Sequence, residues 1–149
     1  MLSKQIAFDA VQKELNNRTT RIQAAFDDLK NALNSESKST AGDKHETGRA
    51  MAQLEQEKLS NQLIQIVNLK EALSKVNPNE DHKRIQFGSL VNTSNGMFFF
   101  SVGLGKLDIN GYDVFCITAT TPLGQLLIGK RKGDSIKMNG RAMKILDIL

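Results

Sequence analysis

The sequence predicts an α+β protein in two parts. Residues 1–77 are expected to form an antiparallel coiled-coil hairpin, and residues 78–149 a small antiparallel β-sheet domain with a short helix. The first part has no proline between residues 3 and 76 and repeats its apolar residues at helical spacing. The second part alternates short apolar runs with Asn-Gly pairs, which are typical of β-hairpins. These two spacings divide the chain near Pro78.

Two amphipathic segments of about 30 residues each fill the first part. In the first segment, apolar residues fall seven apart, at Phe8, Leu15, Ile22 and Leu29. The second segment repeats this spacing at Ala52, Leu59, Ile66 and Leu73. Neither helix can bury such a stripe alone, so the two are expected to fold back on each other. Arg18 falls at the seam, where its aliphatic stem would pack while its guanidinium stays in water.

A polar stretch at residues 34–46 separates the two segments and predicts the bend of the hairpin. Asp43 and Glu46 lie three positions apart in it, between Gly42 and Gly48. An Asp followed three residues later by a Glu is also the pattern of a helix start, with the Asp as cap. Even as a cap, the pair would present two carboxylates on one helical face. The structural and the functional interpretations are therefore compatible.

Two exposed carboxylates suit Mg²⁺, a hard cation that takes one or two carboxylates together with waters and phosphate oxygens. On a bare tip the pair would hold the metal poorly, so we expect no cofactor on the isolated protein. The pair becomes useful if the hairpin carries it into another molecule's site. There it would complete a metal shell around a phosphate that is already bound.

Strands are expected in several stretches of the second part. One is "KRIQFGSLV", in which Ile85 and Phe87 would share a face. Others flank the Asn-Gly pairs at residues 95–96, 110–111 and 139–140, where hairpin turns are expected.

One short helix is expected in "TTPLGQLLIGK". Pro122 suits the first turn of a helix after a Thr cap. Leu123, Leu126 and Leu127 would share one face of this helix, which would end at Gly129.

Composition excludes several classes of protein. A formal net charge of +4, with 40% hydrophobic and 24% charged residues, is ordinary for a folded soluble chain and too weak for autonomous duplex binding. The single cysteine, Cys116, cannot form an internal disulfide and is expected in the core. His45 and His82 lack Cys or His neighbours at ligand spacing, so solvated side chains are expected. Without an apolar leader or membrane span, a cytoplasmic protein is expected.

Taken together, these features resemble the bacterial Gre family of transcript cleavage factors, which bind RNA polymerase. The segments "IQFGSLV", "TPLGQLLIGKRKGDSI" and "NGRAMKILDI" are similar in order and spacing to the family's FKBP-like domain. The segment "AGDKHET" is similar to the family's motif of Gly-Asp, two residues and Glu. This match places the family's two functional acids on Asp43 and Glu46.

The resemblance implies a mechanism. The hairpin enters the secondary channel of a polymerase that has slid backward, and Asp43 and Glu46 help to hold a second Mg²⁺ shared with the polymerase. The polymerase then hydrolyses its own transcript near the RNA 3′ end, so the factor is an accessory protein and not an enzyme. Candidate contacts to RNA phosphates, or simply solvated cations, are Lys38, Lys44 and Arg49. Candidate polymerase-docking residues are Thr121, Pro122, Leu123, Lys130 and Arg131.

Two further interpretations stay open at this point. Many relatives carry an Asn and then an aromatic residue after the Glu, whereas this chain has Thr47, Gly48 and Met51, so no tip aromatic can stack on a base. The protein could instead be a channel-binding regulator that inhibits the polymerase without cleavage. It could also be a coiled-coil adaptor whose tip acids are only caps.

Overall fold

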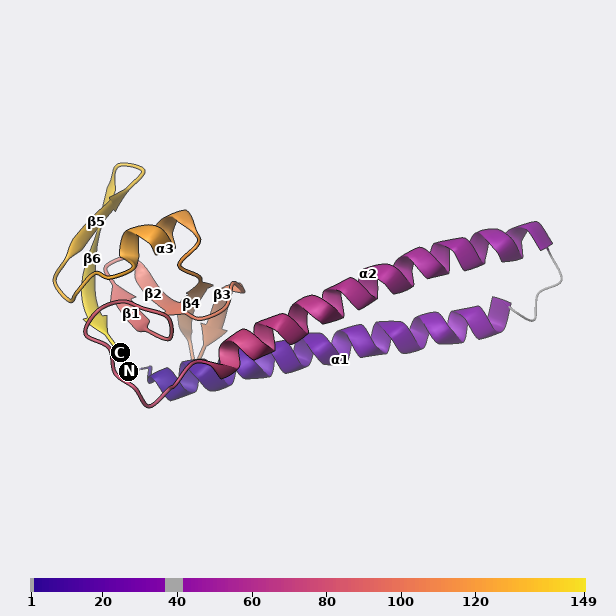
Figure 1. The fold of residues 1–149 in the computed structure, drawn as a ribbon, viewed down its shortest axis with the longest axis horizontal. Helices are drawn as coiled ribbons and strands as arrows, with labels where there is room; N and C mark the ends of the chain where they lie inside the picture. Colours follow the sequence, from indigo (N-terminus) through magenta and orange to yellow (C-terminus); the bar gives the residue numbers. More distant parts are fainter. Residues whose placement is uncertain (1, 37–41) are drawn as a thin grey trace. The chain divides into compact units, whose positions relative to one another are not determined.

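The computed structural model describes residues 2–36 and 42–149, and their side chains except at residues 35, 36 and 42–45. Its elements follow in chain order in Figure 1: α1 (Lys4–Glu36), α2 (Gly42–Ser74), β1 (Leu90–Thr93), β2 (Gly96–Phe100), β3 (Gly105–Ile109), β4 (Tyr112–Ile117), α3 (Pro122–Leu127), β5 (Ser135–Met138) and β6 (Arg141–Ile148). Two long helices followed by a sheet with one short helix confirm the predicted α+β class.

Two compact units make up the chain. Lys13–Lys70 forms one, called here the hairpin unit, and Met1–Gln12 together with Glu71–Leu149 forms the other, called the sheet unit. The sheet unit thus includes the first turns of α1 and the end of α2. A functional boundary at residue 78 stays a prediction.

Five of the eight residues in the predicted seven-residue stripes are buried, whereas Phe8, Leu29 and Ala52 are only partly buried. Helices α1 and α2 each span 33 residues and are therefore about 50 Å long. The buried apolar side chains of the two helices are Ala7, Val11, Leu15, Ile22, Leu59, Ile66 and Leu73. Ser3 caps the amino end of α1, because its Oγ accepts a hydrogen bond from the Ile6 N–H at 3.1 Å. The two helices run in opposite directions (Figure 1).

The bend is shorter than the sequence predicted. Helix α1 continues to Glu36 and α2 begins at Gly42, so much of the expected 34–46 interruption is helical. Gly48 lies inside α2, because the packing of a long helix outweighs the cost of about 1 kcal/mol for one glycine. With α2 beginning at Gly42, Asp43 is the second residue of the helix and not the residue before it, so the prediction that Asp43 caps the helix is wrong.

Arg18 behaves nearly as expected. Its Nε lies 3.0 Å from Oε1 of Glu14, one turn earlier, and its side chain is partly exposed. It lines an open cleft of about 520 Å³ between the helices, together with Ile22, Leu59 and Ile66 among other residues. The guanidinium of Arg18 is thus paired with Glu14 where its side chain lines the cleft.

The strands form one sheet in the order β3-β4-β2-β1-β6-β5. All neighbouring strands are antiparallel except β2 and β4, which pair in parallel from Met97 with Val114 to Phe100 with Ile117. The predicted antiparallel sheet is confirmed except at this pair. The physical reason is that β3 folds back on the outer edge of β4, so β4 lies beside β2 in the same direction.

Two of the three predicted Asn-Gly turns lie where they were expected. Asn110-Gly111 and Asn139-Gly140 have positive φ at both positions, 53° and 86° in the first pair and 51° and 78° in the second. This is the type I′ geometry that Asn-Gly adopts with little strain. In the first hairpin the pairing of Thr93 with Gly96 makes residues 94–95 the loop, so that turn lies one residue earlier than predicted.

The segment before β1 is not the alternating strand that was predicted. Ile85 is buried, but Phe87 is 46% exposed. The chain turns at residues 86–89, just before β1. The Ser89 N–H donates to the Gln86 carbonyl at 3.0 Å, and Gly88 has a φ of 91°. Because the turn breaks the two-residue period, Ile85 and Phe87 do not share a face.

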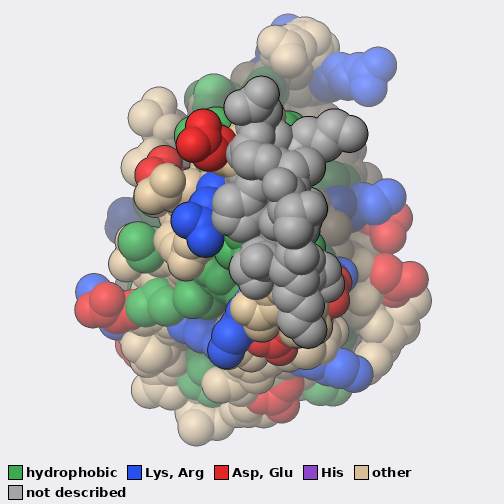
Figure 2. Space-filling model, turned by 90° about the vertical axis from the view of Figure 1, so that its right-hand side faces the viewer, with side chains coloured by type: hydrophobic (Ala, Val, Ile, Leu, Met, Phe, Trp, Pro, Cys, Tyr) green, Lys and Arg blue, Asp and Glu red, His purple; other side chains and the backbone are tan. Residues whose placement is uncertain are grey.

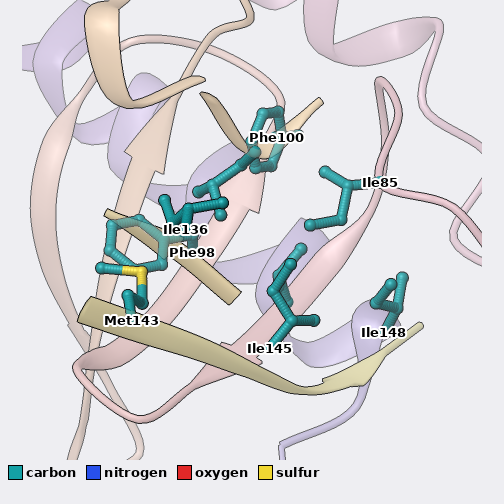
Figure 3. Packing of buried hydrophobic residues seen from close by; sticks show 9 residues of the cluster. Ile85, Phe98, Phe100, Ile136, Met143, Ile145 and Ile148 are labelled. Atoms are coloured by element: carbon teal, nitrogen blue, oxygen red, sulfur yellow. The ribbon is translucent and has the colours of Figure 1, made fainter. Parts of the chain in front are cut away.

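A cluster of buried apolar residues packs together in the sheet unit (Figure 3). Its fully buried members are Ile85, Val91, Phe98, Phe100, Leu127, Ile136, Met143, Ile145 and Ile148. The Phe98 ring also stacks on that of Phe115, with centroids 5.4 Å apart. Cys116 is buried, which confirms the prediction that it is a core residue.

Helix α3 covers part of this core through Leu127, which is buried, and Leu123, which is partly buried. The predicted Thr cap is confirmed, because Thr121 Oγ1 accepts a hydrogen bond from the Gly124 N–H at 3.0 Å. Leu126 is 39% exposed, so its predicted place on the buried face is wrong. A helix of six residues is too short for a third leucine on that face.

Candidate functional site

The predicted acidic pair lies at the start of α2. Asp43 and Glu46 both have helical backbone, so their three-residue spacing places them on one face of the helix. Glu46 is exposed to solvent, whereas the side chain of Asp43 lies outside the described residues. The structure therefore positions the backbone for the pair and one of its two carboxylates.

A magnesium ion fits the chemistry of these donors. Both side chains offer carboxylate oxygens, the ligand type that Mg²⁺ prefers, and Glu46 is open to a partner's site. Among the side chains that the structure describes, no three His, Cys, Asp or Glu residues are grouped closely enough to hold a metal. Asp43 is outside that set, so the metal role of the pair is taken up below as a proposal.

The three cations predicted near the acids are described to different extents. Arg49 is exposed on α2, one turn after Glu46. Lys44 belongs to α2 by its backbone, but its side chain is outside the described residues, and Lys38 lies outside them entirely. In Figure 2, acidic and basic side chains are interspersed on the face shown, with hydrophobic groups between them.

The predicted docking residues lie together around α3 and the turn that follows it. Thr121 caps the helix, Pro122 is its first residue and Leu123 packs against the core. Lys130 and Arg131 follow the helix and are exposed. The first and third of these residues have structural roles, so the two cations and the exposed Pro122 are the groups free to meet a partner.

Sequence reasoning missed a buried polar group at the start of the sheet unit. His82 was expected in solvent but is buried. Its Nδ1 lies 2.7 Å from the Ser89 Oγ. Lys4 is also buried and donates from Nζ to the Glu80 carbonyl. Burial lowers the pKa of both side chains, and the charge of Lys4 lowers the pKa of His82 further.

A basic cleft was missed as well. Lys83, Arg84, Gln86 and Arg131 line an open cleft of about 440 Å³ in the sheet unit. Two segments, "KRIQ" and "GKRK", lie 46 residues apart in the sequence, so only their pairing in space reveals the cleft. The signal available beforehand was that each segment is basic by itself.

Comparisons of the sequence with known proteins find no match, whereas a comparison with solved structures finds similar chains. No family model matches the sequence, and no curated protein is significantly similar to it. The chain is similar to the solved structure of the GreA factor homolog 1 (Gfh1) protein of Thermus thermophilus, with 17% identity, 95% of this chain and 94% of that chain covered, and a TM-score of 0.36. A second structure, of the transcription factor Gfh1, has 18% identity, 95% and 92% coverage, and a TM-score of 0.33.

Within the described residues, no helix combines the length and hydrophobicity that a membrane crossing requires.

Proposed function

We propose that this chain is a cytoplasmic transcription elongation factor that binds RNA polymerase through its secondary channel and stimulates cleavage of backtracked RNA. One observation carries the proposal: α2 begins at Gly42, which places the sequence Gly-Asp-x-x-Glu on helical backbone where the two long helices are joined. Glu46 is exposed there, as a group that acts in another molecule's site must be.

The chain's own residues then have distinct roles. Asp43 would contact a Mg²⁺ ion and Glu46 would position that ion or its water, while the polymerase and the RNA phosphate provide the other ligands. When bound, such an ion stabilises charge on the phosphate and favours ionisation of water. Lys38, Lys44 and Arg49 would contact RNA phosphates beside the acids. The hydrolysis belongs to the polymerase, so the factor has no activity alone.

The sheet unit has a separate task in this proposal. It would dock at the rim of the channel through the surface around α3, with Pro122, Lys130 and Arg131 toward the polymerase. The rigid support for that surface is the core beneath Leu123 and the cap at Thr121. Docking and catalytic support are thus assigned to different units of the chain.

A stalled-complex assay tests the proposal. Backtracked polymerase complexes with labelled RNA are incubated with the wild type, with Asp43→Ala/Glu46→Ala, and with the control Glu55→Ala/Glu57→Ala. The control removes the same charge from exposed positions on the same helix. The wild type and the control are expected to shorten the RNA from its 3′ end, and the tip variant to lose this effect while still binding polymerase in a pull-down.

Each other result has a defined meaning. Equal shortening with the tip variant would contradict the roles of Asp43 and Glu46. Slower synthesis without shortening by the wild type would indicate an inhibitory channel-binding regulator. Failure of the wild type to associate with polymerase would favour the adaptor interpretation.

A further inference from the structure

The basic cleft of the sheet unit has a fixed backbone. Arg84 and Arg131 form an isolated antiparallel bridge, which places them opposite each other on neighbouring segments. Beside the bridge, the Ile85 N–H donates to the Lys130 carbonyl at 2.9 Å and the Gly129 N–H donates to the Ile85 carbonyl at 2.7 Å. Ile85 itself is buried in the core. The two arginines are therefore held at fixed positions by the fold.

The charge around this bridge is one-sided. Lys83, Arg84, Lys130, Arg131 and Lys132 are all exposed. Of these five, only Lys132 has an acidic side chain within ion-pair distance in the described part of the chain, Asp147 at 3.9 Å.

The nearest acids in the sequence are fewer than these cations, and one of them, Asp134, lies at Arg131 itself. Asp134 accepts a hydrogen bond from the Arg131 backbone N–H at 2.8 Å, and Glu80 lies 3.9 Å from the ring of His82. The charge of Asp81 acts on Lys4 and His82. The cleft thus keeps a local excess of positive charge.

Two arginines opposite each other are an unfavourable pair by themselves. Residues directly across an antiparallel ladder have Cβ atoms about 5 Å apart, and like charges at that spacing repel. An anion bound between the two guanidinium groups would be attracted to both and would offset their mutual repulsion. The guanidinium group also matches the geometry of phosphate oxygens and binds them through paired N–H donors.

We infer that this cleft is a binding site for the phosphate groups of a single-stranded nucleic acid. Gln86 lines the cleft beside the two arginines. Phe87, the next residue in the chain, exposes 46% of its surface, and exposed aromatic side chains are the usual platform for an unpaired base in single-strand sites. An acidic peptide would use the cations but not the ring. The inference does not depend on the cleavage function proposed above, although it assigns Arg131 to a nucleic acid where that proposal assigns it to the polymerase.

A binding assay with the isolated full-length protein tests the site. The probe is a labelled polyuridine oligonucleotide of about twelve nucleotides, followed by fluorescence anisotropy at several salt concentrations. The variant Arg84→Gln/Arg131→Gln is compared with Lys106→Gln/Lys137→Gln, which removes the same charge from β3 and β5 at the two edges of the sheet. Thermal unfolding of each variant verifies that it is folded.

The wild type is expected to bind with a steep salt dependence. The arginine variant should bind about tenfold or more weakly at low salt, and its salt slope should fall by about 1.4, because each phosphate contact on a single strand contributes about 0.7. The lysine control should bind within about twofold of the wild type. Equal losses in both variants, or no binding by the wild type, would overturn the inference.

Two further measurements identify the occupant. Phe87→Ala should weaken RNA binding by about five- to tenfold without changing the salt slope, because stacking releases no counterions. A polyglutamate peptide of matched charge should compete poorly with the RNA. Competition as strong as that of unlabelled RNA would assign the cleft to an acidic protein and reject the nucleic acid.

Discussion

The hairpin unit and the sheet unit bury their apolar side chains in different patterns. In the hairpin unit, buried residues recur every seven positions, and large apolar side chains on the other faces of α2 stay in water, including Met51, Leu54, Ile64 and Val67. In the sheet unit, nine buried residues from four strands, α3 and the segment before β1 form one cluster. We therefore expect the hairpin unit to tolerate changes on most of its surface and the sheet unit to be sensitive to changes in its core.

The largest expected effect comes from the core of the sheet unit. Phe100→Ala removes a buried ring and leaves a cavity among residues from several elements, so the free energy of unfolding should fall by about 3–5 kcal/mol. Urea unfolding followed by the fluorescence of Tyr112 reports on this unit, because the chain has one tyrosine and no tryptophan. Phe87→Ala, at an exposed position, is the control and should change stability by less than about 0.5 kcal/mol. Equal losses at both positions would contradict the core assignment.

A smaller effect is expected in the hairpin unit. Ile66→Ala should lower its stability by about 2 kcal/mol, the low end for such a change, because Ile66 already borders an open cleft that water can enter. Far-ultraviolet circular dichroism during urea unfolding follows the helices. Met51→Ala, at a side chain that is 67% exposed, should be close to neutral. A loss for Met51→Ala as large as for Ile66→Ala would show that the exposed face of α2 is covered in solution.

The smallest effect concerns pH and the buried His82. Its pKa in the folded protein is lowered from 6.5, first by burial and then by the charge of Lys4, while Glu80 and Asp81 raise it in part. The unfolded chain therefore binds the proton more readily, and stability should fall as the pH drops below about 6.5. The slope can reach at most about 1.4 kcal/mol per pH unit for one proton.

Tyr112 fluorescence in urea at several pH values between about 7 and 5 measures this dependence. In His82→Gln, the part of the pH dependence that comes from this side chain should vanish, although the variant will be less stable at neutral pH. An unchanged pH dependence in that variant would assign the effect to other groups.

Local signals in the sequence predicted much of this fold. The seven-residue spacing predicted both long helices, the Thr-Pro pair predicted the start of α3, and two Asn-Gly pairs predicted their turns to the residue. These signals work because each depends on neighbours within about one turn of chain. The acidic pair was also legible, because its spacing is a property of one helix.

Other features required long-range information. The parallel pairing of β2 with β4 depends on where β3 folds, which no local pattern states. His82 looked like a solvated residue, because nothing nearby in the sequence reveals that Ser89 and Lys4 surround it. The predicted bend at residues 34–46 was too long. Glycine and serine lower helical propensity, but this cost does not outweigh the packing of a long helix.

The sequence by itself determined the two-part organisation, both helical stripes and the identity of the two acids at the start of α2. These follow from spacing along the chain, and spacing is a covalent property. Only the tertiary structure decided the order of the strands, the burial of His82 and the meeting of Arg84 with Arg131. Such contacts join residues that are distant along the chain, and their energies depend on which surfaces the folded backbone brings together.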